Sequence, residues 1–223
     1  MNTTHLTVLK RIGGNDPDYK GKNTFLWSNA VAPGLKRDDK LDMQFDREFL
    51  FDYCKRDHNS GIEMLVAILS WGGMRIDHGK HLLANPSWAL EIVSKLRKGE
   101  FSTREEAFHE IQKLRNKGLL PGMGIGYFTK LICFLAPQLK GYIMDQWVGK
   151  SVNLISGSNI VSLTSNSWVN DKNDCKTYES FCTVIDRVGQ ELDCTGFEAE
   201  RRLFSIGNDK GKWRNYVKSN CKR

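Results

Sequence analysis

A lysine and an aspartate stand out as residues that could act together on one substrate. Lys130 lies in an apolar run beside Leu131 and Phe134, and Asp145 directly follows the apolar run 141–144. Burial near the start of a helix disfavours an ammonium ion, so the neutral amine becomes available as a nucleophile. A fixed carboxylate stabilises a positive charge that develops during reaction. The pair therefore predicts nucleophilic catalysis assisted by a fixed anion.

Three glycines at alternate positions precede the lysine. They are Gly122, Gly124 and Gly126, in the sequence Leu-Pro-Gly-Met-Gly-Ile-Gly that starts at Leu120. Glycine reaches positive φ and allows another backbone to approach closely. Exposed N–H groups at such a turn, with a helix behind them, form an anion site suited to a nucleic-acid phosphate. The alternative is an ordinary αα-hairpin whose glycines only permit the turn.

Helices are expected on both sides of these glycines. Ser102 to Glu105 has the pattern of a helix cap, and Gly118 falls just past the end of the helix that follows. A second helix runs from about Tyr127 until Pro137 stops it. The unit is helix, glycine hairpin, helix, over residues 102–136. Asp145 is placed to cap a third helix by accepting its first N–H bonds.

The stretch from Leu120 to Leu135, followed by Gly141 to Val152, resembles the helix-hairpin-helix (HhH-GPD) DNA glycosylase superfamily, and within it the bacterial 8-oxoguanine glycosylase group. The resemblance implies an all-α, two-lobed single domain over residues 1–223, with the hairpin and an aspartate loop at 141–152 in the cleft between lobes. It also places the catalytic aspartate on Asp145. Bifunctional relatives carry their lysine at the position of Gly126, and Lys130 follows it by about one helical turn. We therefore assign the nucleophile to Lys130.

The resemblance also implies DNA contacts. We expect Gly122, Gly124, Gly126 and Lys150 to hold the DNA backbone. An extruded base leaves a gap in the duplex, and an inserted side chain offsets part of that cost. Such a wedge would come from Trp71, Met74 or Arg75, at the end of an apolar helix. The alternative for Trp71 is a place in the core.

Three further aromatic residues are candidates for the base pocket. They are Trp147, Phe204 and Trp213, of which the last two are interleaved with Lys and Arg. Such side chains stack on an extruded base or pack in the core. For Phe204 and Trp213, packing in the core is the favoured interpretation.

The charge distribution favours a polyanionic partner. The net charge is +7, and residues 201–223 hold eight Lys or Arg against one acid. This basic C-terminal tail is either a solvated segment or a phosphate-binding surface. The expected partner is double-stranded DNA that contains a damaged or modified base, bound with salt-sensitive affinity.

Other classes of site find little support. The six cysteines include no C-x-x-C pair, and the five histidines show no zinc pattern. We therefore expect no metal, no iron–sulfur cluster and no cofactor. No signal peptide and no membrane span is evident. The expected protein is a cytoplasmic, nucleoid-associated monomer.

The rest of the chain predicts further helices. An apolar run at 61–71 is long enough for a buried central helix, and residues 46–55 and 177–192 read as amphipathic helices. Residues 1–23 are polar, and we expect them to be loose or an edge. Residues 156–176, rich in Ser and Asn, predict a long surface loop.

The expected function is excision of an oxidised purine, most simply 8-oxoguanine, followed by strand cleavage at the abasic site. Lys130 would attack the sugar and Asp145 would stabilise the oxocarbenium charge. Two alternatives remain open. A monofunctional glycosylase would use Asp145 to activate water, and a non-enzymatic helix-hairpin-helix module would only bind DNA.

Overall fold

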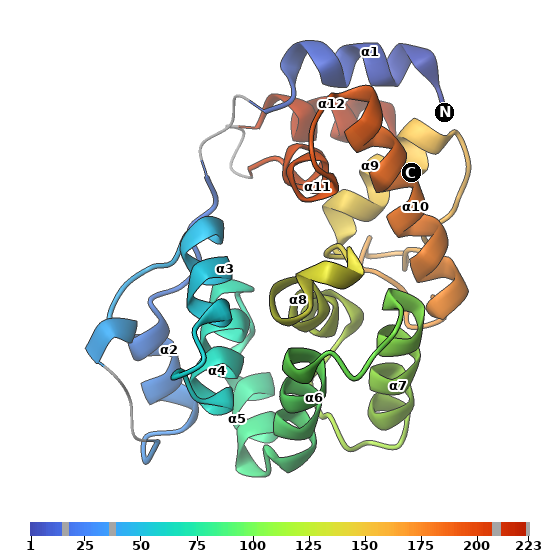
Figure 1. Ribbon diagram of the computed structural model, residues 1–223. Helices are drawn as coiled ribbons and strands as arrows, with labels where there is room; N and C mark the ends of the chain where they lie inside the picture. Colours follow the sequence, from blue (N-terminus) through green and yellow to red (C-terminus); the bar gives the residue numbers. More distant parts are fainter. Residues whose placement is uncertain (15–17, 36–38, 207–210, 222–223) are drawn as a thin grey trace. The chain divides into compact units, whose positions relative to one another are not determined.

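The part of the chain that the structure describes is all-helical, as the sequence predicts. A computed structural model describes residues 1–14, 18–35, 39–206 and 211–221 (Figure 1). Within them the isolated β-bridges are Asn23 with Gln44 and Leu163 with Val169. Short 3₁₀ segments lie at Asp39–Leu41 and Pro137–Leu139. The α-helices are α1 Thr3–Ile12, α2 Thr24–Val31, α3 Arg47–Lys55, α4 Gly61–Trp71, α5 Ile76–Ala84, α6 Ser87–Lys98, α7 Arg104–Asn116, α8 Ile125–Leu135, α9 Gln146–Ser156, α10 Cys175–Glu191, α11 Gly196–Phe204 and α12 Lys212–Asn220.

These helices belong to two compact units. The central unit is residues 18–139 and carries α2 to α8. The terminal unit joins residues 1–17 to residues 140–223 and carries α1 and α9 to α12. Lys130 therefore belongs to the central unit and Asp145 to the terminal unit.

The core of the central unit is built on α4 and α8. Helix α4 starts with a capping box, in which Ser60 and Glu63 satisfy each other's backbone N–H groups. Every residue from Met64 to Trp71 is buried, which is typical of a helix that packs on all sides. Helix α4 contacts α2, α3, α6 and α8, and α8 also contacts α3, α6 and α7.

A short segment rich in glycine joins α7 to α8. Thr103 caps α7 by accepting a hydrogen bond from the Glu106 N–H, and residues 117–124 then form what we call the glycine turn. Gly118 and Gly122 have φ values of 75° and 74°, a region that L side chains rarely adopt. The described residues therefore show two helices, α7 and α8, joined by the glycine turn.

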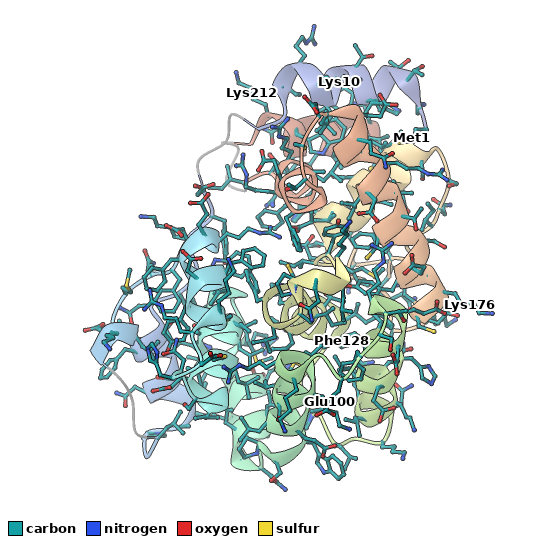
Figure 2. The ribbon with its side chains drawn as sticks, in the orientation of Figure 1. Met1, Lys10, Glu100, Phe128, Lys176 and Lys212 are labelled. Carbon is teal, nitrogen blue, oxygen red and sulfur yellow. The ribbon has the colours of Figure 1, made fainter. Side chains whose placement is uncertain are left out.

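Helix α9 is central to the terminal unit. Asp145 caps its start, and Gly157, whose backbone lies in the left-handed region, caps its end. Val148, Val152 and Ile155 are fully buried, and α9 contacts α1, α10, α11 and α12. Figure 2 labels Phe128, which is buried in α8, and Lys10, Lys176 and Lys212 on helices of the terminal unit.

The N-terminal prediction is wrong for residues 3–12, which form α1. Asn2 caps the helix by accepting hydrogen bonds from the N–H groups of Thr4 and His5. Leu6 and Leu9 are buried, and α1 packs on α9 and α12. A polar helix with one short apolar stripe is stabilised mainly by this packing, which local sequence does not reveal.

Two other segments differ in detail from the expectations. Residues 141–144 are buried as expected, but they form neither helix nor strand. In the basic tail, residues 212–220 form α12, whose Trp213 and Val217 are fully buried. This part of the tail therefore contributes to the core in addition to carrying positive charge. Residues 207–210 and 222–223 lie outside the described residues.

Candidate catalytic residues and DNA contacts

The Lys130 side chain is enclosed within the central unit. It is 8% exposed, and its Nζ donates a hydrogen bond to the Gly126 carbonyl at 2.7 Å. The same Nζ lies 5.5 Å from the centre of the Tyr127 ring. Helical side chains lean towards the N-terminus of their helix, so Lys130 places its amine at the level of Gly126.

Gly72, just past α4, forms one wall of this enclosure. A Cβ at this position would lie 2.8 Å from Cδ and 3.0 Å from Cε of Lys130. Because such contacts are too short for a real Cβ, only glycine leaves the lysine in its present path. The residue thus fixes the position of Lys130, a role that its place in the sequence did not indicate.

The glycine turn leaves the start of α8 open. Gly124 is the N-cap residue, and within the described residues no side chain caps the helix there. A Cβ at Gly124 would meet nothing within 4 Å. Gly122, in contrast, is pressed against His78, because a Cβ there would lie 2.7 Å from the His78 Cβ. Open N–H groups at a helix start favour an anion.

Asp145 is a half-buried cap at the start of α9. Its Oδ1 accepts hydrogen bonds from the N–H groups of Trp147 and Val148, at 2.8 and 2.9 Å. Among the described residues, Oδ2 accepts none. The buried run 141–144 and these two bonds hold the carboxylate in one orientation. The cap that the sequence predicts is present.

Three cations surround the Trp147 ring. The Arg214 guanidinium lies 4.7 Å, the Lys150 Nζ 4.6 Å and the Lys218 Nζ 5.9 Å from its centre. Arg214 also lies 4.6 Å from the centre of the Phe204 ring and donates to the Phe204 carbonyl. Charged groups from α9 and α12 thus gather around one indole, two residues after Asp145.

The three wedge candidates differ in accessibility. Trp71 is 5% exposed and Met74 is fully buried, whereas Arg75 is exposed. Trp71 makes edge contacts with the rings of Tyr19 and Phe134. Of the three, Arg75 is the side chain that DNA can reach in this conformation.

Arg75 pairs with Asp77 of α5, and its backbone forms a hydrogen bond with Tyr127 of α8. Its guanidinium donates two hydrogen bonds to Asp77, at 3.0 and 2.8 Å. These bonds raise the pKa of Arg75 and lower that of Asp77. Burial raises the pKa of the Tyr127 phenol, and a hydrogen bond with the Arg75 backbone opposes this shift.

Trp213 and Phe204 have different surroundings. Trp213 is fully buried, and its Nε1 donates to the Ser151 hydroxyl at 3.0 Å. It is therefore part of the core, as the favoured interpretation of the sequence had it. Phe204 is partly exposed beneath Arg214.

The structure also bears on metals and membranes. Among the described residues, no group of three or more His, Cys, Asp or Glu side chains is arranged to hold a metal ion. None of the described helices is long and apolar enough to cross a membrane.

A family comparison supports the assignment that the site suggests. Residues 22–204 match the family model described as "Putative 8-oxoguanine DNA glycosylase OGG-like protein". The chain belongs to this OGG-like family. The matched region of this OGG-like protein contains Gly72, the glycine turn, Lys130 and Asp145, whereas α1 and α12 lie outside it. No significant match was found among curated proteins or among solved structures.

Proposed function

We propose that this OGG-like protein is a base-excision DNA glycosylase with lyase activity at abasic sites, acting on an oxidised purine such as 8-oxoguanine. Membership of the family supports glycosylase activity on DNA. The lyase activity and the choice of base are inferred from the residues. The observation that carries the proposal is the enclosed amine of Lys130, held at Gly126 with one wall formed by Gly72.

The reaction starts when the lesion nucleotide is extruded from the duplex. The neutral Lys130 amine attacks C1′ of the sugar, a C–N bond forms, and the bond from C1′ to the base breaks. The base leaves with the electron pair of that bond and takes up a proton. Asp145 stabilises the positive charge that develops on the sugar, a task that suits an anion fixed by two backbone N–H groups.

Strand cleavage follows from the covalent intermediate. Ring opening gives an imine between Lys130 and C1′. Loss of a C2′ proton then expels the 3′ phosphate by β-elimination, and water later releases the lysine. The same lysine thus serves both steps.

DNA binding is assigned to the glycine turn and to the cations around Trp147. The open start of α8 at Gly124 suits one phosphate. Lys150 contributes a second positive charge from α9. Arg75 is the proposed wedge. Contacts of this kind give affinity that is independent of sequence and falls with salt.

The test is incubation with duplexes that carry a panel of damaged bases, with and without borohydride. We expect excision of an oxidised purine and a covalent DNA adduct when borohydride reduces the imine. Lys130→Gln should abolish both the adduct and strand cleavage. Lys113→Gln, which removes an exposed lysine of α7, is the matched control and should keep both.

The outcomes separate the proposal from its alternatives. Excision without an adduct would identify a monofunctional glycosylase that uses Asp145 to activate water. Duplexes left intact across the panel would contradict the enzymatic proposal altogether.

A further inference from the structure

Tyr142 lies at the centre of a hydrogen-bonded cluster that precedes Asp145 in the terminal unit. Its side chain is 1% exposed, and it stands three residues before the carboxylate. Residues 141–144 form neither helix nor strand, so the regular hydrogen bonds of such elements do not hold this segment. Its path therefore depends on contacts with side chains of neighbouring helices.

Helix α10 holds Tyr142 at two points. The Tyr178 hydroxyl donates a hydrogen bond to the Tyr142 carbonyl at 2.9 Å, and the Tyr142 hydroxyl donates to Asp186 Oδ1 at 2.5 Å. Tyr178 is fully buried and Asp186 is half-buried. The two α10 side chains are separated by about 12 Å of helix rise. Two points of attachment on one helix fix both the position and the direction of Tyr142.

Helix α11 also packs against the Tyr142 ring. The Phe197 ring meets it edge-on, with the ring centres 5.3 Å apart. A Cβ at Gly196 would overlap the Tyr142 hydroxyl, so any larger residue at that position would displace it. Phenylalanine rings would fill a similar volume, but hydroxyls with defined partners specify one orientation in a buried place.

The attachment continues from Tyr142 to the carboxylate through the backbone. The Asp145 N–H donates to the Ile143 carbonyl at 3.1 Å, and Asp145 Oδ1 accepts the first N–H groups of α9. Ile143 and Met144 are buried as well. A shift of Tyr142 therefore reaches Asp145 through residues that are themselves held in the core.

We propose that Tyr178 and Asp186 are positioning residues, which act through Tyr142 to keep the Asp145 carboxylate in place for the charge that develops on the sugar. The inference rests on the proposed function, in which Asp145 stabilises that charge. Neither residue needs to touch DNA for this role. Loss of one hydrogen bond from the cluster should displace the carboxylate by less than about 1 Å, and reaction rates are sensitive to displacements of that size.

The first experiment removes one hydroxyl in two backgrounds. Tyr178→Phe keeps the ring and loses the bond to the Tyr142 carbonyl. On the duplex of the lesion panel that the wild type cleaves fastest, the single-turnover rate of excision should fall about 5- to 30-fold, with an unchanged dissociation constant for DNA. In an Asp145→Asn background the same substitution should slow the residual excision by less than about 2-fold, because the charge that it positions is already absent.

Tyr216→Phe is the matched control. It makes the same chemical change in the same unit, where the Tyr216 hydroxyl is hydrogen-bonded to His5 Nδ1 at 2.8 Å and joins α12 to α1. This variant should keep the wild-type rate of excision. Melting curves establish that each variant is folded.

Asp186 offers a conservative pair of variants. Asp186→Asn keeps an oxygen that accepts from the Tyr142 hydroxyl, whereas Asp186→Ala does not. We expect Asp186→Ala to lose as much of the excision rate as Tyr178→Phe, and Asp186→Asn to stay within about 3-fold of the wild type. Equal losses in the two variants would contradict a role through this hydrogen bond.

The Tyr178→Phe result decides between positioning and support of the fold. A loss confined to the background with Asp145 intact supports the inference. A wild-type rate in Tyr178→Phe, or the same fractional loss in both backgrounds, would overturn it, because a loss of folded protein lowers both rates by one factor.

Hydrogen exchange separates this inference from the proposed function. If no lesion of the panel is excised, the proposed function fails, and the positioning is then tested at the Trp147 and Val148 amides, which donate to Asp145. These amides should exchange at least about 5-fold faster in Tyr178→Phe than in the wild type, because the cap is less firmly held. Unchanged exchange would show that Tyr178 does not hold Asp145.

Discussion

Lys130 depends on contacts that its local sequence does not show. The residue was predicted as a nucleophile from its apolar neighbours, and family resemblance placed the usual lysine at Gly126. The side chain reaches back one turn to the Gly126 carbonyl, so the Lys130 amine lies beside that position. The wall at Gly72, 58 residues earlier in the chain, could not be inferred from spacing.

Gly72→Ala tests this wall. The new methyl group would overlap the flexible end of Lys130, so the lysine moves and the fold is largely kept, at a cost of about 1 kcal/mol. A displacement of about 1 Å in a nucleophile costs up to about 100-fold in rate. We expect borohydride trapping to slow by about 10- to 100-fold in single-turnover kinetics.

The control for that variant is Gly34→Ala, because a Cβ at Gly34 meets nothing within 4 Å. It should trap DNA at the wild-type rate. An unchanged rate in Gly72→Ala would show that the wall does not position the amine.

The Asp145→Asn variant separates the helix-capping role of Asp145 from the role of its negative charge. Asparagine caps a helix as well as aspartate does, so unfolding free energy should change by less than about 1 kcal/mol. Loss of the anion should reduce excision by about 100- to 1000-fold. Asp174→Asn, at the cap of α10 in the same unit, should leave excision unchanged. Equal activities in the two variants would remove Asp145 from the chemistry.

Most helices could be predicted from local signals. Thr103 caps α7, Gly99 ends α6 in the left-handed region, and the apolar run at 61–71 forms α4. These signals are local because caps and periodic apolar faces act within a few residues. Helix α1 was missed because its stability comes from packing on α9 and α12.

The start of α8 offers a test at the level of an element. Gly124→Ser introduces a capping hydroxyl where no side chain caps the helix, so stability should rise by a few tenths of a kcal/mol. The same hydroxyl occupies the N–H groups assigned to a phosphate, so DNA affinity should fall by about 3- to 10-fold. Urea unfolding and anisotropy titrations measure the two effects. If stability and DNA affinity both rose, or both fell, the result would argue against a phosphate site at this turn.

At the scale of the whole molecule, the C-terminal segment 201–223 carries both basic residues and a buried core side chain. Residues 201–223 hold a large excess of positive charge, yet Trp213 in α12 is fully buried and bonded to Ser151. Composition predicted the charge, but the burial depends on α9, which lies about 60 residues earlier in the chain. Helix α12, within this segment, is thus part of the fold of the terminal unit.

Trp213→Ala should therefore destabilise the protein by about 3–5 kcal/mol. Trp168→Ala is the matched control, because Trp168 is 62% exposed, and its effect should stay within about 0.5 kcal/mol. Calorimetry or urea unfolding measures both. A small effect at Trp213 would contradict its place in the core.

The central claim is that the Lys130 amine forms the covalent bond to the sugar. It is tested by trapping the protein on an 8-oxoguanine duplex with borohydride, digesting the adduct and locating the modified residue by mass spectrometry. The account predicts that the reduced sugar is attached to Lys130 and that Lys130→Gln yields no adduct. Attachment to another lysine or to the N-terminal amine, with full activity in Lys130→Gln, would contradict it.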